Sequence, residues 1–324
     1  MLHHLRFGRL ALCVSALFLA ASAQAADLEK ISKLLPDETE TVMSINIRQI
    51  LDSAVVKKYG MDKLKDALDN QGDVKDYLKD MGLDPFKDID SIIIGSAGSS
   101  DTDKGLVIIN GRFNPEKVEA KVKELSDDKS DAIKVDKIGK HTVFEISVPN
   151  QPQSMFACVL SKNMILAASS KGTLEDAIKK EAGDKTTKLK NKQLGEVVAK
   201  MDDKQSFWMV MPASALPPDI GNSNEEVKKI LDNVEIITAG ATLTDKLVIK
   251  AGITAKDAES AKSIKNKIRG GLDFVKGMLA FNEQYAPLAE AIGKIKATAN
   301  DKTISIEGEL SAEDLEQLFK LGDQ

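Results

Sequence analysis

The sequence has 324 residues, of which 42 % are hydrophobic and 29 % charged, with a formal net charge of −5. Its lysines are interspersed with aspartates and glutamates, so it lacks the clustered basic residues with which proteins bind nucleic acids or anionic lipids. Aromatic residues make up 4 % of the chain, which disfavours a cleft that stacks sugar rings.

Residues 1–25 have the three parts of a secretory signal peptide. A short basic region precedes the apolar run Leu10–Ala20, and the small residues around Ala25 suit cleavage after that position. The apolar run is shorter than the roughly 20 residues that span a bilayer, and no later segment approaches that length. We therefore expect an exported chain, periplasmic or extracellular, without a transmembrane segment after cleavage.

The next part of the chain alternates strand and helix patterns. A β-rich run, Thr41–Ile47, precedes helical spacing over Arg48–Asn70 and a short helix over Val74–Met81. Two strands then form a hairpin, and a helix begins at Asn114-Pro115, where asparagine caps and proline fits the first turn. Further segments complete this part: a hairpin around Gly139-Lys140 and a hairpin with a helix capped by Thr173 over Ser154–Lys180.

The remaining part repeats this order. Its segments are a strand at Ser206–Pro212, a helix at Glu225–Asp232, a hairpin around Thr244–Lys246, a long helix capped by Thr254, a hairpin around Asn300-Asp301 and a last helix starting at Ser311. The long helix has an apolar stripe from Ala258 to Leu279 that Gly270 and Gly271 interrupt. Such a stripe is typical of packing on a sheet, and binding to a partner or a lipid surface is the alternative.

The shared order of strands, turns and caps indicates an internal duplication, with Thr102–Ala120 and Thr244–Ala261 as near-doubles. We predict an α+β fold of two tandem ferredoxin-like β-α-β-β-α-β(β) units, each an antiparallel sheet with helices packed on one face. The first unit, 26–183, includes the extra hairpin and helix, and the second is 184–324. The lysine-rich stretch Gly183–Lys192 marks the boundary.

Three stretches of the sequence carry a resemblance to a known family. They are LLPDETETVMSINIRQILDS (Leu34–Ser53), MGLDPFKDIDSI (Met81–Ile92) and KGLVIINGRFN (Lys104–Asn114). They resemble a family of exported bacterial proteins of unknown function, in which a signal peptide precedes a Leu-Pro-Asp opening and an LDPFKDID-type segment. The resemblance implies export, and it implies no activity, cofactor or functional residue.

Residues for common catalytic chemistry are scarce. After the leader, His141 is the only histidine, which excludes the HExxH pattern and His-rich zinc sites. Cys158 is then the only cysteine, so it has no disulfide partner in the chain, and no basic residue adjoins it to lower its pKa. Nucleophile-elbow, phosphate-loop and dinucleotide-binding motifs do not occur. We therefore assign no catalytic residue, no metal ligand and no cofactor.

Two weaker signals remain. Acidic pairs such as Asp88 and Asp90, Asp202 and Asp203, and Glu225 and Glu226 are common in this chain, and nothing in the sequence distinguishes one pair as catalytic. Trp208 is the only tryptophan. We interpret it as a core or domain-contact anchor, and it is also the one candidate for ligand contact, because tryptophan is common at interfaces.

These observations favour an exported non-catalytic protein of the cell envelope that binds an unknown protein or small molecule, with a cleft between the two units as the place to look. A carboxylate-based secreted hydrolase and a self-assembling structural envelope protein are the alternatives. Nucleic acid is not an expected partner.

Overall fold

The computed structural model describes residues 32–70, 73–98, 102–128, 132–147, 153–216, 220 and 225–322. The predicted signal peptide lies outside these residues. Within the described part of the chain, no helix is both long enough and apolar enough to cross a membrane.

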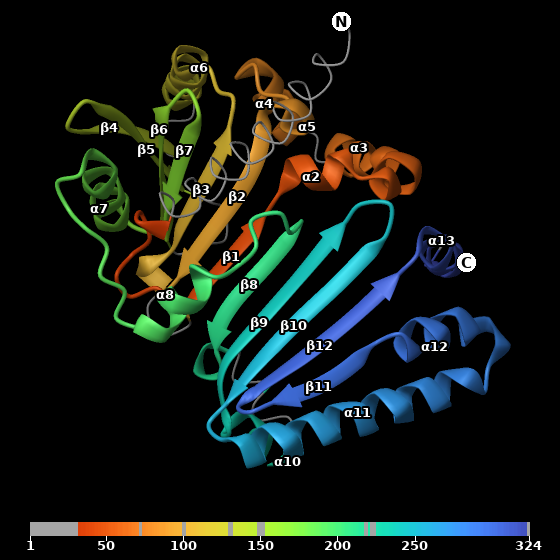
Figure 1. Cartoon of the computed structure of the whole chain (residues 1–324). Coiled ribbons are helices and arrows are strands. Elements are labelled where there is room, and N and C mark those ends of the chain that lie inside the picture. Colours follow the sequence, from red (N-terminus) through yellow and green to blue (C-terminus); the bar gives the residue numbers. More distant parts are fainter. Residues whose placement is uncertain are drawn as a thin grey trace, which may run out of the picture.

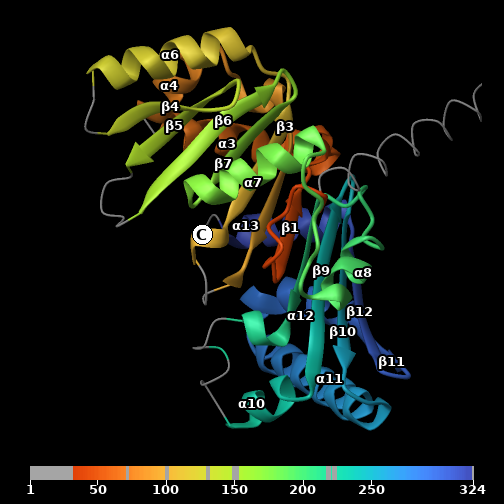
Figure 2. The ribbon, with the colours of Figure 1, turned by 90° about the vertical axis from the view of Figure 1, so that its left-hand side faces the viewer.

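The described strands form one antiparallel sheet (Figure 1). They are β1 (Thr41–Ile45), β2 (Ile89–Ser96), β3 (Leu106–Gly111), β4 (Ile133–Ile138), β5 (His141–Ser147), β6 (Ser154–Ser161), β7 (Met164–Ala168), β8 (Phe207–Pro212), β9 (Val234–Leu243), β10 (Leu247–Ala255), β11 (Lys296–Asn300) and β12 (Thr303–Leu310). Their order in the sheet is β11-β12-β10-β9-β8-β1-β2-β3-β7-β6-β5-β4. The sheet is strongly twisted, so that β5 and β6 run at a steep angle to β9 and β10 (Figure 2).

The two halves of the chain share this sheet because β1 pairs with β8. Val42 lies opposite Val210 and Ser44 opposite Trp208, and the Asn46 backbone N–H donates to the Ser206 carbonyl at 2.8 Å, just beyond the paired residues. The expectation of two separate sheets is therefore wrong. Each unit alone would leave β1 or β8 as an unpaired edge, and pairing them satisfies both rows of backbone groups.

The strand order repeats on the two sides of this junction. Reading outward, the order is β1-β2-β3-β7-β6 on one side and β8-β9-β10-β12-β11 on the other, with the β4–β5 hairpin added at the outer edge. The hairpin that corresponds to β11–β12 is thus β6–β7, and β4–β5 is the extra one. A split β-α-β unit requires parallel strands joined through a helix. All the described pairs are antiparallel, so the ferredoxin-like arrangement is not confirmed.

Helices cover both faces of the sheet. They are α2 (Ile47–Asp52), α3 (Met61–Asp69), α4 (Asp73–Asp80), α5 (Pro85–Asp88), α6 (Pro115–Asp128), α7 (Lys171–Ala182), α8 (Lys192–Val198), α10 (Glu225–Leu231), α11 (Ala258–Ala280), α12 (Ala286–Gly293) and α13 (Ala312–Gly322), with a π-helical turn η1 (Val56–Gly60) before α3. Short 3-10 turns lie at η3 (Thr102–Lys104), η4 (Ala213–Ala215) and η5 (Glu283–Tyr285).

The prediction that helices pack on one face only is wrong, because α7 and α11 lie on opposite faces of the sheet. The alternation of side chains along the strands shows this. Leu166 packs with α7 in the main core. The pairing registers place Leu166 on the same face as Trp208 and Glu307. The neighbouring position Ile306 therefore lies on the opposite face, where it packs with Ile264 of α11.

Two helix caps differ from the sequence prediction, and each differs for a local reason. The cap of α7 is Ser170, whose hydroxyl accepts from the Thr173 N–H, so Thr173 already lies within the helix. The cap of α11 is Asp257, which accepts from the Ser260 N–H, because Thr254 still belongs to β10 and pairs across the sheet. Gly183, with a φ of 85°, ends α7 in the left-handed conformation that suits glycine.

The main core crosses the junction between the halves. It combines β1–β3, β6 and β7 with α7 from the first half and α8, β8 and β9 from the second. Lys180 of α7 is also buried, with 1 % of its side chain exposed, and donates to Asp37 at 2.8 Å and to the Leu35 carbonyl at 2.6 Å. Burial alone would raise the pKa of Asp37, but the hydrogen bonds from Lys180 and Lys188 hold it below its ordinary value.

A second contact ties the turn after α2 to the last helix. The Tyr59 ring stacks on Phe319 with 5.6 Å between centroids, and its hydroxyl donates to Glu316 at 2.6 Å. Val55 is buried beside Leu315 in the same cluster. The first half therefore contacts the second at this place as well as along β1 and β8.

The last helix begins at a reciprocal cap, as predicted. Asp314 accepts from the Ser311 N–H at 2.7 Å, and the Asp314 N–H donates to the Ser311 hydroxyl at 3.3 Å. The hydrogen bond from Lys294, together with those from Ser311, lowers the pKa of Asp314 to about 2.

Candidate functional site

A hollow of about 920 Å³ lies where the central strands end. It is formed by the ends of β1, β2, β3, β6 and β7, the C-terminus of α7, the start of α2 and the residues before β8. Its polar lining residues are Ser44, Asn46, Arg48, Gln49, Asp90, Ser91, Asn110, Ser161, Asn163, Glu181, Asp203 and Lys204. The hollow thus lies at the junction of the two halves, as the predicted cleft would. It lies against one continuous sheet, however, and not between two separate sheets.

Strand alternation brings these residues together. Ser44 of β1 lies directly opposite Ile93 of β2, and Asn110 of β3 lies opposite Met164 of β7; all four line the hollow. Toward this end, apolar core residues give way to polar ones: Asn46 follows β1 and caps α2 by accepting from the Gln49 N–H at 3.0 Å.

An arginine fixes the wall of the hollow. Arg48 donates through Nε to Asp90 at 3.2 Å and through a terminal nitrogen to the Phe86 carbonyl at 3.1 Å. It also donates to the Lys87 carbonyl, as does Arg112. These bonds join the end of β1 to the start of β2, so we assign Arg48 a structural role and regard the Asp90 carboxylate as already paired.

Two buried acceptors in the lining lack a hydrogen-bond partner among the described residues. They are Gln49 Oε1 and Asp203 Oδ2. Leaving a buried polar atom unsatisfied costs about 1–3 kcal/mol, and most buried polar atoms in proteins are hydrogen-bonded. Both atoms are buried acceptors in residues that line the hollow, so a rotation of each side chain toward the hollow would present it to a ligand that donates hydrogen bonds.

Trp208 lies in the core and not in this lining. It is 1 % exposed and points to the same face of the sheet as Ser44. Its Nε1 and Gln205 Oε1 have no partner in the described structure. The interpretation of Trp208 as a core anchor between the halves agrees with this position, and its contact with a ligand stays a prediction.

The other residues considered from sequence are dispersed. His141 starts β5 at a turn, and Cys158 is buried, which raises its pKa to about 12. Asp88 accepts from the Asp84 N–H, and Glu226 pairs with Lys267. In the described residues, no group of three or more His, Cys, Asp or Glu side chains is placed to hold a metal ion.

Sequence reasoning named Asp90 and Asp203 only within acidic pairs, and it missed Asn46, Gln49 and Asn110. The available signal was a polar residue at the end of an apolar strand: Asn46 directly follows β1, and Asn110 is the last residue but one of β3. Gln49 carried no such signal, because a glutamine is ordinary in a short helix.

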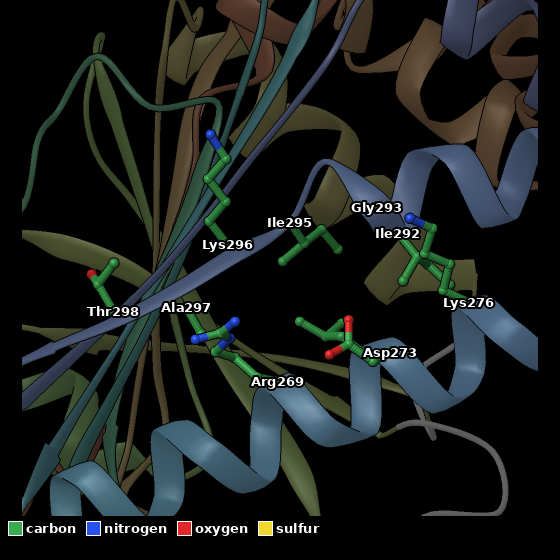
Figure 3. A pocket seen from close by; sticks show the side chains of 10 residues that line it. Arg269, Asp273, Lys276, Ile292, Gly293, Ile295, Lys296, Ala297 and Thr298 are labelled. Atoms are coloured by element: carbon green, nitrogen blue, oxygen red, sulfur yellow. The ribbon is translucent and has the colours of Figure 1, made fainter.

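A smaller hollow of about 330 Å³ lies between α11 and β11 (Figure 3). Arg269 and Asp273 reach into it from α11, whereas Lys296 points away from the helix (Figure 3). Its lining residues are mostly charged or aliphatic, and none of its buried polar atoms is unsatisfied in the described structure. We therefore take the hollow at the junction as the candidate site.

No family model matches the chain, and no curated protein matches it. Two solved structures of TP0453 are similar in fold. Crystal form III has a TM-score of 0.49 and crystal form I a TM-score of 0.44; each is 9 % identical in sequence, and each comparison covers 87 % of this chain and 94 % of that one. Similarity at this level carries no argument about function.

Proposed function

We propose that this chain is a non-catalytic binding protein that takes a small polar molecule into the hollow at the junction of its halves. The observation that carries the proposal is the pair of buried acceptors, Gln49 Oε1 and Asp203 Oδ2, in one polar lining. A ligand with two or more hydrogen-bond donors would satisfy both acceptors. Binding would then remove the free-energy cost of leaving these acceptors unsatisfied in the free protein.

The charges around the hollow narrow the class of ligand. Arg48 is paired with Asp90, which leaves Glu181 and Asp203 against Lys204 in the lining. No aromatic residue belongs to the described lining, so ring stacking does not contribute. We infer a neutral ligand, or one with a single positive charge, such as a polyol or an amino alcohol.

We further propose that the protein acts outside the cytoplasm, in the periplasm or beyond the cell. The signal-peptide pattern in residues 1–25 and the resemblance to exported bacterial proteins support this location. The repeated strand order supports descent from two related units, 26–183 and 184–324.

A thermal-shift panel tests the ligand class. We expect at least one of glycerol, sorbitol, ethanolamine and diethanolamine to raise the melting temperature, while citrate and phosphate at equal ionic strength do not. Saturation at about 100 times the dissociation constant adds about 2.7 kcal/mol of stability. Asp203→Asn and Gln49→Leu should each remove the shift, and Asp245→Asn, in the exposed loop after β9, should retain it. A panel without any shift, or a shift that survives both lining variants, would contradict the proposal.

One observation keeps the hydrolase as a second candidate: three carboxylates, Asp90, Glu181 and Asp203, line the same hollow. Carboxylate-based hydrolysis requires one group protonated and one ionised. The protein would then cleave chromogenic glycosides, and Glu181→Gln and Asp203→Asn would each abolish the cleavage. That result would favour the hydrolase over the binding protein.

A further inference from the structure

The C-terminal half of α11 and its C-cap residue, Phe281, expose large apolar side chains to solvent. Phe274 is 70 % exposed, Met278 55 % and Phe281 93 %. Figure 1 shows α11 at the periphery of the molecule, along the edge strand β11. A contiguous apolar group of this kind marks an interaction surface more often than a scattered single residue does.

The two phenylalanines form one stripe along the helix together with two glycines. Gly270, Phe274, Gly277 and Phe281 follow one another at steps of four, three and four residues, which is the spacing of the contact positions of a helix pair. The stripe lies on the opposite side of α11 from Ala261 and Ile264, which are buried against the sheet.

The protein itself does not explain the glycines. A Cβ added at Gly270 or Gly277 would meet no described atom within 4 Å. Each glycine in a helix interior costs about 1 kcal/mol relative to alanine. A close approach of another helix at these positions accounts for both, since only glycine leaves room for a large side chain from outside.

We propose that two copies of this chain dimerise through antiparallel α11 helices. Gly270 and Phe281 have the same midpoint in the helix as Phe274 and Gly277, between residues 275 and 276. A two-fold axis at that midpoint sets Phe274 over Gly277 of the second copy and Phe281 over Gly270 of the second copy. Each contact then occurs twice, as an isologous interface requires.

The positions of the glycines favour a second copy over a lipid surface. Helices that lie on membranes place lysine or arginine beside their apolar face, and α11 does carry Lys265, Arg269 and Lys276. A lipid surface, however, gives no reason for glycine at 270 and 277, whereas the close approach of a second helix does. In the antiparallel pair Asp273 lies beside Ala280 of the second copy, so no like charges meet.

The size of the surface predicts a weak dimer. An aromatic side chain buries about 150–250 Å², so two phenylalanines and one methionine from each copy bury roughly 1,000 Å² together, at the lower limit for a specific interface. The dimer should therefore form in the micromolar range and dissociate on dilution.

Sedimentation equilibrium of the full exported chain from about 1 to 500 µM tests the proposal. We expect a reversible monomer–dimer equilibrium that Phe274→Glu weakens by more than about tenfold, a loss typical of a central interface residue. Val135→Glu, which places the same charge on the exposed edge strand β4, should leave the equilibrium unchanged. A monomer at all concentrations would overturn the proposal.

Glycine variants separate this dimer from non-specific apolar association. Gly277→Leu should stabilise the monomer, because leucine has the higher helix propensity and a Cβ at this position meets no described atom within 4 Å, and it should weaken the dimer by filling the space for Phe274 of the second copy. If Gly277→Leu instead strengthens association, or increases co-sedimentation with vesicles of anionic lipid, the antiparallel pairing is wrong. Mixing Gly270→Cys with Phe281→Cys should give a disulfide between copies, whereas a parallel pair would cross-link Phe281→Cys with itself. These readouts do not depend on a ligand in the hollow.

Discussion

Val210→Ala tests whether the two halves of this chain unfold together. Val210 of β8 is fully buried and lies opposite the buried Val42 of β1, at the pairing that joins the halves. The change removes the equivalent of two methylene groups, about 1.6 kcal/mol of transfer free energy at about 0.8 kcal/mol each. The unfilled space in a tightly packed core raises the expected loss to about 2–3 kcal/mol.

The chain carries its own probe for this experiment. Trp208 is the only tryptophan and lies in the same strand as Val210, so its fluorescence reports the junction, while far-UV circular dichroism reports all helices and strands. We expect both signals to give the same urea transition in the parent protein, because one core crosses the junction. In the variant both transitions should move to lower urea by the same amount, with an unchanged slope.

The control is Val135→Ala, the same change at an exposed position of β4. It should shift neither transition by more than about 0.5 kcal/mol. If circular dichroism shows two steps, and Val210→Ala moves only the step that fluorescence also reports, the halves fold separately and 26–183 and 184–324 are independent domains.

Other consequences of the structure can be tested in the same way. Lys180→Ala leaves Asp37 without its buried partner and should lose about 2–4 kcal/mol in urea unfolding, with a smaller loss for the Asp37→Asn, Lys180→Met pair; equal losses would contradict a direct interaction. Gly240→Ala places a Cβ 2.4 Å from the Gln205 amide and should lose about 1–3 kcal/mol, which Gln205→Ala should restore; an additive double variant would exclude that clash. Because the pKa of Asp314 is lowered to about 2, its ionised form stabilises the folded state above its ordinary pKa near 3.8 and this contribution disappears as the pH falls toward 2; Asp314→Asn should flatten the pH dependence of stability in that window, and an unchanged profile would refute the assignment.

Local sequence patterns predicted most strands and helices of this fold, but they did not predict which strands pair with each other. The β1 and β8 segments were identified from composition, but a strand's partners depend on residues far away in the chain. One clue was present: Val42 and Met43, like Trp208 and Met209, put apolar side chains on both faces of their strands. Strands that are apolar on both faces occupy the centre of a covered sheet, so this pattern argued against placing either strand at an edge.

The candidate site was less accessible to sequence reasoning than the fold. Gln49 and Asp203 are separated along the chain by most of the first half, and neither residue type is unusual in its segment. Their shared property, a buried acceptor without a partner, exists only once tertiary structure is formed. Trp208 attracted notice because of its rarity, and burial explains that residue without a ligand.

The pairing of β1 with β8 also positions the site, and this gives a final prediction. Because the strands are antiparallel and Ile45 lies opposite Phe207, Gln49 follows β1 at the same end of the pair where Asp203 precedes β8. A ligand that donates hydrogen bonds to both side chains holds the two strands together, so ligand binding and the pairing of β1 with β8 stabilise each other. Val210→Ala should therefore lower the affinity for the ligand identified in the thermal-shift panel, although Val210 does not belong to the described lining. Isothermal titration of the folded variant measures this, and an unchanged affinity would show that the hollow is formed independently of the junction.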